Sequence, residues 1–293
     1  VRKLVEDDLP KMRREDQVFV AYEREPPVKT WMSANLSLYN GFFNLTSTYT
    51  QDSDIPFTVN QNYVVDDSKY KSLMNVTFAK GKRRDVPVAW FVSRCPTQSK
   101  REEYVKEMQK YIKVDIYGRC GSLKCNDNTK PLDDSCVRKL LGDKNSYKFY
   151  LSFENSLCDA YVTEKLYKIL QHPVVPVVRG AFQYKRLLPP KTYIDSRDFK
   201  SPKELAEFLL RLHNNDQEYD EYVRRKTAMK SYRHFYRPVE CVFCKALHAR
   251  RGEKSVVHAL DDFWGSKRCI RPELFDEHHL NNDFQVDLHE IST

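Results

Sequence analysis

Several features that would classify a chain quickly are missing from this sequence. No stretch approaches the ~20 consecutive apolar residues that a membrane-spanning helix requires, and no N-terminal signal segment is visible. No internal repeat stands out. The net charge of +8 arises from scattered clusters, whereas a nucleic-acid-binding protein concentrates its basic residues in one stripe, so we expect no nucleic-acid partner. What remains is a chain of 293 residues, 41% of them hydrophobic, which can fold as two domains with a sizeable core.

Taken alone, these absences favour a cytosolic protein, but the cysteine content opposes that interpretation. The Cys-x-x-Cys pair Cys241 and Cys244 has no second pair at zinc-finger distance, although His248 and Cys269 could complete a metal site. We favour disulfides, which form in the secretory pathway, and the sequence leaves their pairing open. The eight candidates are Cys95, Cys120, Cys125, Cys136, Cys158, Cys241, Cys244 and Cys269.

Three sequons for N-linked glycosylation support the same compartment. They place acceptor side chains at Asn35, Asn44 and Asn75. Each sequon is a weak signal alone, but together with the cysteines they favour passage through the secretory pathway.

The order of predicted elements divides the chain into two units. Residues 1–80 contain a strand at 18–22, which ends at a proline pair, and turn-forming residues at 51–56. A basic segment at 81–85 has the composition of a linker. A strand of the buried type at 86–92 begins the second unit.

The second unit, residues 86–240, alternates strands and helices. A helix is predicted over 100–113 from its apolar periodicity, a strand over 114–117, and a helix that begins with a capping box over 201–212. Residues 120–143 show no periodicity, and we interpret them as a disulfide-stapled loop. This order predicts a doubly wound parallel sheet.

The centre of the second unit is a strand–helix–strand motif with a polar loop. The strand at 147–155 ends in Asn155, a short helix is predicted over 166–171, and a second strand over 174–178. Open α/β sheets bind ligands at the carboxyl ends of their strands, and a helix that begins there directs free N–H groups toward an anion. Lys165 adds a positive charge. The motif therefore predicts a site for a phosphorylated small molecule.

Residues 149–167, FYLSFENSLCDAYVTEKLY, resemble the signature of the α1,3-fucosyltransferases, which are inverting enzymes that use GDP-fucose. The resemblance covers about residues 16–270. It implies an α/β chain of GT-B-like fold with two Rossmann-like domains, of which we expect the N-terminal one to be incomplete in this chain. The family usually has Asp directly before the tyrosine, whereas this chain has Ala160.

The resemblance also assigns roles to the predicted units. Residues 1–80 become the acceptor-side domain, 81–85 the linker, and 86–240 the GDP-fucose-binding domain. Residues 241–293 become a cysteine-containing tail that packs back on the body, because we expect Cys241, Cys244 and Cys269 to fasten it there.

Five residues are implied to bind the donor. Asn155 and Glu164 would contact fucose or ribose hydroxyls, and Tyr161 and Lys165, four residues apart, would share a helix face that meets the pyrophosphate. Arg101 matches the family's phosphate-binding arginine, because a guanidinium can bind two phosphate oxygens at once. Arg94 and Lys100 are alternatives for this role.

An inverting transfer needs one general base for the acceptor hydroxyl. Glu25, directly before the proline pair, matches the family's base. Glu23 lies two residues earlier on the same strand face and is the alternative.

The resemblance predicts no obligatory metal or other cofactor besides the donor. Asp52 and Asp54 could be mistaken for a metal-binding Asp-x-Asp motif, but we interpret them as turn residues. Lys165 and Arg101 would then take the place of a divalent ion. The histidines show no metal-ligand spacing.

The predicted function is inverting α1,3-fucosyl transfer to a GlcNAc 3-hydroxyl. Residues 114–121, the Cys-x-x-Cys pair and residues 261–264 look most like invertebrate enzymes that modify the innermost GlcNAc of N-glycans. Lewis-type transfer to lactosamine and an inactive sugar-binding protein on the same scaffold are the alternatives. The family implies a type II membrane protein of the Golgi lumen, anchored by a segment absent from this chain.

Overall fold

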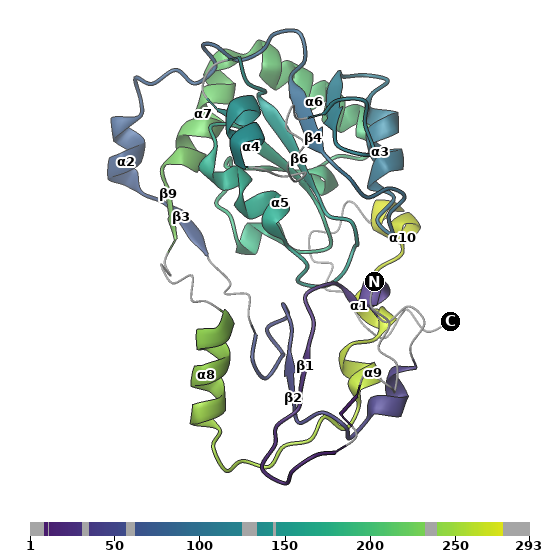
Figure 1. Ribbon diagram of the computed structural model, residues 1–293. Coiled ribbons are helices and arrows are strands. Elements are labelled where there is room, and N and C mark those ends of the chain that lie inside the picture. Colours follow the sequence, from purple (N-terminus) through teal and green to yellow (C-terminus); the bar gives the residue numbers. More distant parts are fainter. Residues whose placement is uncertain are drawn as a thin grey trace.

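A computed structural model describes residues 9–10, 12–30, 35–56, 62–124, 134–142, 145–231 and 239–277. Figure 1 shows two masses of structure, with the larger one above the smaller. We call residues 62–231 the sheet body, residues 12–56 the N-terminal unit and residues 239–277 the tail.

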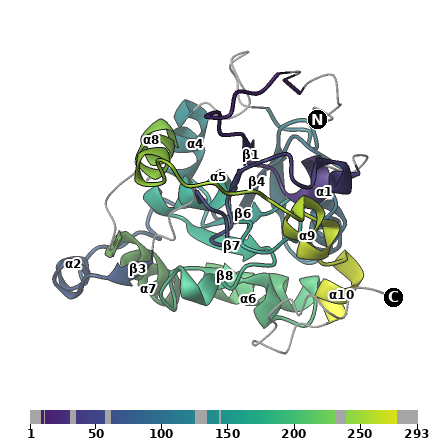
Figure 2. The ribbon, with the colours of Figure 1, turned by 90° about the horizontal axis from the view of Figure 1, so that it is seen from below.

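The sheet body is built on five parallel strands in the order β5-β4-β6-β7-β8, as predicted. Figure 2 shows β4, β6, β7 and β8 side by side in this order. The strand order reverses between β4 and β6, which makes that point the topological switch where open sheets bind ligands. The strands are β4 (Val88–Phe91), β5 (Val114–Tyr117), β6 (Phe149–Phe153), β7 (Val175–Arg179) and β8 (Ile194–Asp195).

Helices cover both faces of this sheet, so the strands are buried on both sides. Trp90 and Leu151 point into the core that contains α3, α6 and α7, whereas Ala89 and Tyr150 point into the core that contains α4 and η3. Such burial explains why β6 reads as a continuous apolar run. The helices are α3 (Arg101–Met108), α4 (Asp134–Leu141), α5 (Glu164–Tyr167), η3 (Ile169–Gln171), η4 (Tyr184–Arg186), η5 (Ser196–Asp198), α6 (Pro202–Asn214) and α7 (Asp216–Thr227).

Three details differ from the sequence predictions. The helix predicted over 166–171 begins earlier, at Glu164, and ends at Tyr167 before a separate 3-10 turn. The segment predicted to lack periodicity contains α4. At α6 the Ser201 hydroxyl accepts from the Glu204 N–H as predicted, but the Glu204 carboxylate accepts from the Lys200 N–H instead of closing the box on Ser201.

The N-terminal unit contains a parallel strand pair, in which Val20 lies opposite Leu45. The residues that follow the N-terminal unit join the sheet body. There β3 pairs antiparallel with β9, and the Asp220 carboxylate accepts from the N–H groups of Phe78 and Ala79. The elements are β1 (Val20–Tyr22), α1 (Pro27–Thr30), η2 (Leu36–Tyr39), β2 (Leu45–Ser47), β3 (Tyr63–Val65), α2 (Asp67–Ser72) and β9 (Met229–Ser231).

The tail contacts both masses. Phe243 lies 5.6 Å from the ring of Tyr22 in the N-terminal unit, and Asp276 forms an ion pair with Arg179 in the sheet body. Its elements are α8 (Val239–Ala249), α9 (Leu260–Phe263), η6 (Ser266–Arg268) and α10 (Pro272–Glu277). None of the helices in the described residues has the length and apolar character of a membrane span.

Candidate active site

The switch point of the sheet collects the polar residues singled out from the sequence. Arg94 follows β4, and Glu154 and Asn155 follow β6, so their side chains leave adjacent strands at the same sheet edge. Glu25 and Lys29 approach this edge from the N-terminal unit, where Glu25 lies 3.9 Å from Arg94. The site is therefore a junction between two parts of the chain.

A buried carboxylate orders the loop after β6. Glu154 is 1% exposed, and its Oε1 accepts from the backbone N–H and the hydroxyl of Thr163 at 2.8 and 2.9 Å. Its Oε2 accepts from the Lys165 ammonium at 2.8 Å. The sequence prediction missed Glu154, although a charged residue at the end of an apolar strand is a detectable signal, because buried charges require partners.

Lys165 therefore does not extend freely toward a ligand. Its ammonium also lies 2.6 Å from the Thr163 hydroxyl and 3.7 Å from Glu164, whose side chain is exposed. Lys165 is held at the strand end by its neighbours, and Glu164 remains accessible for a hydroxyl-bearing ligand. Their predicted contacts with the donor stay predictions.

Tyr161 lies before α5, so the predicted shared helix face with Lys165 is wrong. The Lys165 ammonium is still 5.8 Å from the centre of the Tyr161 ring. That ring packs at 5.1 Å against Tyr49, which in turn contacts Trp264 of the tail. Three distant segments thus meet around Tyr161, and only its hydroxyl reaches the site.

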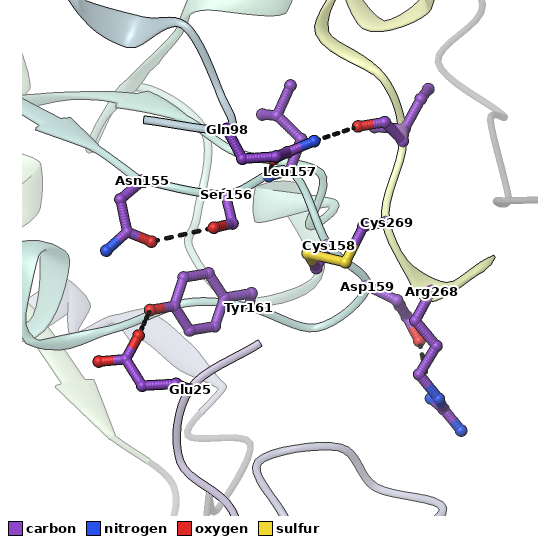
Figure 3. Close-up of a disulfide and its surroundings, with 11 residues drawn as sticks. Glu25, Gln98, Asn155, Ser156, Leu157, Cys158, Asp159, Tyr161, Arg268 and Cys269 are labelled. Carbon is purple, nitrogen blue, oxygen red and sulfur yellow. Dashed lines mark hydrogen bonds and ion pairs between the residues drawn. A yellow bond between two sulfur atoms is a disulfide. The ribbon is translucent and has the colours of Figure 1, made fainter. Parts of the chain in front are cut away.

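That hydroxyl donates a 3.4 Å hydrogen bond to Glu25 Oε2, and Asn155 lies beside the pair (Figure 3). Burial, followed by the nearby Glu154 and Glu25 carboxylates, raises the pKa of Tyr161, so the phenol stays protonated and can donate. Asn155 is buried, and its Oδ1 accepts from the Ser156 hydroxyl at 3.2 Å.

The geometry distinguishes the two glutamates proposed as the base. Glu23 Oε1 accepts from the backbone N–H groups of Arg24 and Glu25 at 2.7 and 2.8 Å, which fixes the turn, and burial raises its pKa. The Glu25 carboxylate instead faces Tyr161, Arg94 and Lys29. This arrangement favours Glu25 for the catalytic role.

Arg101 is more enclosed than a phosphate ligand was expected to be. It is 3% exposed, donates to the carbonyl oxygens of Phe153 at 2.5 Å and Arg94 at 3.3 Å, and lies over the Trp90 ring. Its Nε has no partner among the described residues. Arg101 thus links the end of β6 to the segment after β4. The phosphate contact predicted for Arg101 stays a prediction. The side chain of Arg94, the alternative, is 63% exposed.

Lys29 is a site residue that the sequence analysis missed. Its Nζ lies 3.7 Å from Glu25 Oε2 and has no hydrogen-bond partner among the described residues. Burial lowers the pKa of Lys29 to about 8, while Glu25 acts in the opposite direction and the cations Arg94, Lys165 and Arg101 lower it further. No pattern around residue 29 could have revealed this, because Lys29 becomes buried only when the two parts of the chain meet.

The two aspartates of the Asp-Ser-Asp segment are structural, as the turn prediction implies. Asp54 accepts from the N–H and hydroxyl of Thr46 at 2.8 Å, and Asp52 forms an ion pair with Arg268 of the tail. Burial alone would raise the pKa of Asp52. The hydrogen bond from Arg268 acts in the opposite direction, and the pKa lies below its usual value. Within the described residues no cluster of three or more His, Cys, Asp or Glu could hold a metal ion.

Two disulfides are present in the part of the chain that the structure describes. Cys95 pairs with Cys120, and Cys158 pairs with Cys269, which fastens the tail to the loop after β6 (Figure 3). Cys125 and the side chain of Cys136 lie outside the described residues.

The prediction that Cys241 and Cys244 form disulfides is wrong. Both are free and exposed on α8, whereas Cys269, the third cysteine expected to fasten the tail, is bonded to Cys158. Of the three cysteines expected to fasten the tail, Cys269 forms a disulfide with the body.

The three sequons lie in different surroundings. Asn35 and Asn75 are exposed. Asn44 is half-buried, and its amide N–H donates to the Ser255 carbonyl at 2.8 Å. Glycosylation at the three positions stays a prediction.

Two family models match this chain over most of its length. The family model for the C-terminal part of glycosyltransferase family 10 (fucosyltransferase) matches residues 81–264, and the fucosyltransferase N-terminal model matches residues 2–60. The chain is 35% identical over 283 residues to alpha-(1,3)-fucosyltransferase C of Drosophila melanogaster, covering 87% of this chain and 61% of the relative. It is 38% identical over 237 residues to glycoprotein 3-alpha-L-fucosyltransferase A of the same organism, covering 79% and 44%.

The chain thus spans between 44% and 61% of the length of these curated relatives. A crystal structure of an α1,3-fucosyltransferase with GDP-fucose is similar in fold, with a TM-score of 0.54 at 16% identity. The match covers 84% of this chain and 78% of the other. This likeness confirms the GT-B-like fold predicted from the sequence.

Proposed function

Because this chain belongs to the fucosyltransferases of glycosyltransferase family 10, we propose that it transfers fucose from GDP-fucose to a GlcNAc 3-hydroxyl with inversion. The observation that carries the proposal is the placement of Glu25. A carboxylate from the N-terminal unit meets the strand ends at the switch point, 3.9 Å from Arg94 and hydrogen-bonded to Tyr161, over whose ring Lys165 lies. A base on one side and positive charge on the other are what a transfer with an anionic leaving group requires.

In the proposed reaction Glu25 removes the proton from the acceptor hydroxyl. The acceptor oxygen forms a bond to the anomeric carbon of fucose while the bond from that carbon to the phosphate oxygen breaks, and GDP leaves with the electron pair. The positive charges of Lys165 and Arg94, with Arg101 behind them, stabilise the charge that develops on the diphosphate. Asn155 and Glu164 orient sugar or ribose hydroxyls.

For the acceptor we propose the innermost GlcNAc of N-glycans. Support comes from the Drosophila relative named as a glycoprotein 3-alpha-L-fucosyltransferase and from the Cys-x-x-Cys and 261–264 segments of the sequence. Location in the Golgi lumen as a type II membrane protein is part of the same proposal.

The test is to incubate the protein with GDP-fucose and a panel of glycans with core-type and lactosamine-type GlcNAc. Mass spectrometry then shows which glycan gains one deoxyhexose. Gain on core-type acceptors alone supports the proposal, and gain on lactosamine alone would assign a Lewis-type enzyme. If GDP binds and no acceptor is modified, the protein is a sugar-nucleotide-binding member without transferase activity.

A further inference from the structure

We propose that Lys29 is a positioning residue for Glu25: with Tyr161 it holds Oε2 of the carboxylate and leaves Oε1 to take the acceptor's proton. The inference rests on the proposed function and deepens it. It concerns a side chain that no sequence pattern singled out.

Lys29 and Tyr161 approach the same oxygen of the Glu25 carboxylate. Lys29 lies one helical turn after Glu25, and its Nζ is 3.7 Å from Oε2. The Tyr161 hydroxyl donates to the same oxygen from the sheet body at 3.4 Å. Oε1 has a looser neighbour, the exposed guanidinium of Arg94 at 3.9 Å. The carboxylate is thus held on one side and accessible on the other.

The Lys29 side chain is buried, and the neighbouring Glu25 carboxylate explains why. The Lys29 side chain is 16% exposed and its Nζ is fully buried without a hydrogen bond among the described residues. Burying an ammonium is costly, because the charge loses its hydration. A lysine on a short surface helix ordinarily extends into water. Here it points inward, where Glu25 is the anion that attracts it.

The chemical consequence concerns the charge state of the base. A general base must be ionised before it can accept a proton, and a cation within 4 Å favours the ionised carboxylate. As the O–H bond of the acceptor breaks, a new O–H bond forms at Oε1, while Lys29 keeps its own protons. Lys29 therefore acts through Glu25 and has no direct contact with the substrates.

The groups that face Lys29 also determine its pH response. They are Glu25 from its own segment, Arg94 after β4, Arg101 of α3 and Lys165 of α5. With a pKa of about 8, Lys29 has lost half of its charge at that pH and loses most of the rest above it. We expect kcat/KM to decline there in the wild type and the decline to be absent in Lys29→Arg, because a guanidinium keeps its charge.

The experiment compares Lys29→Met with Lys29→Arg. We expect Lys29→Met to lower kcat about tenfold, because the carboxylate loses the cation that positions it, and to abolish the alkaline decline of kcat/KM, because methionine has no charge to lose. The KM for GDP-fucose and the Kd for GDP, measured by calorimetry, should change less than about threefold. Lys29→Arg should restore most of kcat.

The matched control is Lys203→Met, which removes a lysine from another i,i+4 pair, with Glu207 at 3.8 Å on the exposed face of α6. It should leave kcat and the pH profile unchanged. Full activity and a retained alkaline decline in Lys29→Met would overturn the inference. So would a loss of GDP affinity at unchanged kcat, which would make Lys29 a donor ligand instead. If the wild type transfers fucose and Lys29→Met gives either of these results, the inference is wrong and the proposed function is retained. If the wild type is inactive on every acceptor, both the inference and the proposed function are wrong.

Discussion

Two charged groups meet at the strand ends of this protein, and the chain holds them in different ways. On the proposed donor side, Lys165 is fixed by Glu154 and Thr163, with the Lys165–Glu154 pair separated by 11 residues in sequence. On the proposed acceptor side, Glu25 is fixed by Tyr161, which lies 136 residues away. The first cluster belongs to one loop of the sheet body, whereas the second exists only where the N-terminal unit and the sheet body meet.

The tail explains how this second cluster is maintained. Trp264 packs on Tyr49, Tyr49 packs on Tyr161, and Cys269 is bonded to Cys158 three residues before Tyr161. The segment that aims the Tyr161 hydroxyl is therefore fastened from outside the sheet body. Loosening the tail should disturb the base more than the cationic loop.

Removal of the Cys158–Cys269 disulfide should produce the largest effect. The loop that it closes spans a sequence separation of 111 residues, so the chain-entropy argument predicts a loss of about 4 to 5 kcal/mol in the free energy of unfolding. The double variant Cys158→Ala/Cys269→Ala tests this by urea denaturation. Cys95→Ala/Cys120→Ala is the control, and its separation of 25 residues predicts a smaller loss of about 3.5 kcal/mol. Equal losses, or a larger one in the control, would show that loop length does not govern this difference.

Substitution of the base comes next. Glu25→Gln should lower kcat about 10³-fold with the GDP affinity retained, because the carboxamide cannot take the proton from the acceptor. Glu23→Gln is the matched control: its side-chain carbonyl can still accept from the N–H groups of Arg24 and Glu25, so activity should stay near that of the wild type. If Glu23→Gln instead loses activity and Glu25→Gln keeps it, Glu23 is the general base.

The donor-side cluster should respond mainly in stability and in donor binding. Lys165→Met leaves the buried Glu154 carboxylate without its cation, so we expect the free energy of unfolding to fall by about 3 kcal/mol and the affinity for GDP to weaken. The double variant Glu154→Gln/Lys165→Met removes both charges and should recover part of the stability, measured as a coupling in a double-mutant cycle. A loss below about 0.5 kcal/mol in the single variant would mean that the pair is solvated in solution.

The same contrast explains what could be predicted from the sequence. The strand–loop–helix–strand order, the parallel sheet and the cap of α6 all depend on local composition in residues 86–212. The candidate base Glu25 came from the family resemblance. The prediction of Tyr161 on a helix failed, because α5 begins only after its N-cap Thr163, beyond Tyr161. The prediction for Cys241 and Cys244 failed because spacing alone does not determine which sulfur atoms meet.

The sequence by itself determined the doubly wound sheet and the polar loop at its switch point, where the donor-binding residues are proposed. These follow from periodicity and capping, which act over a few residues. Only the tertiary structure decided which oxygen of Glu25 is held, that Lys29 is buried beside it, and that the tail fastens Tyr161. Those contacts join segments far apart in the chain, and no local pattern encodes a contact that forms only when distant surfaces lose their water together.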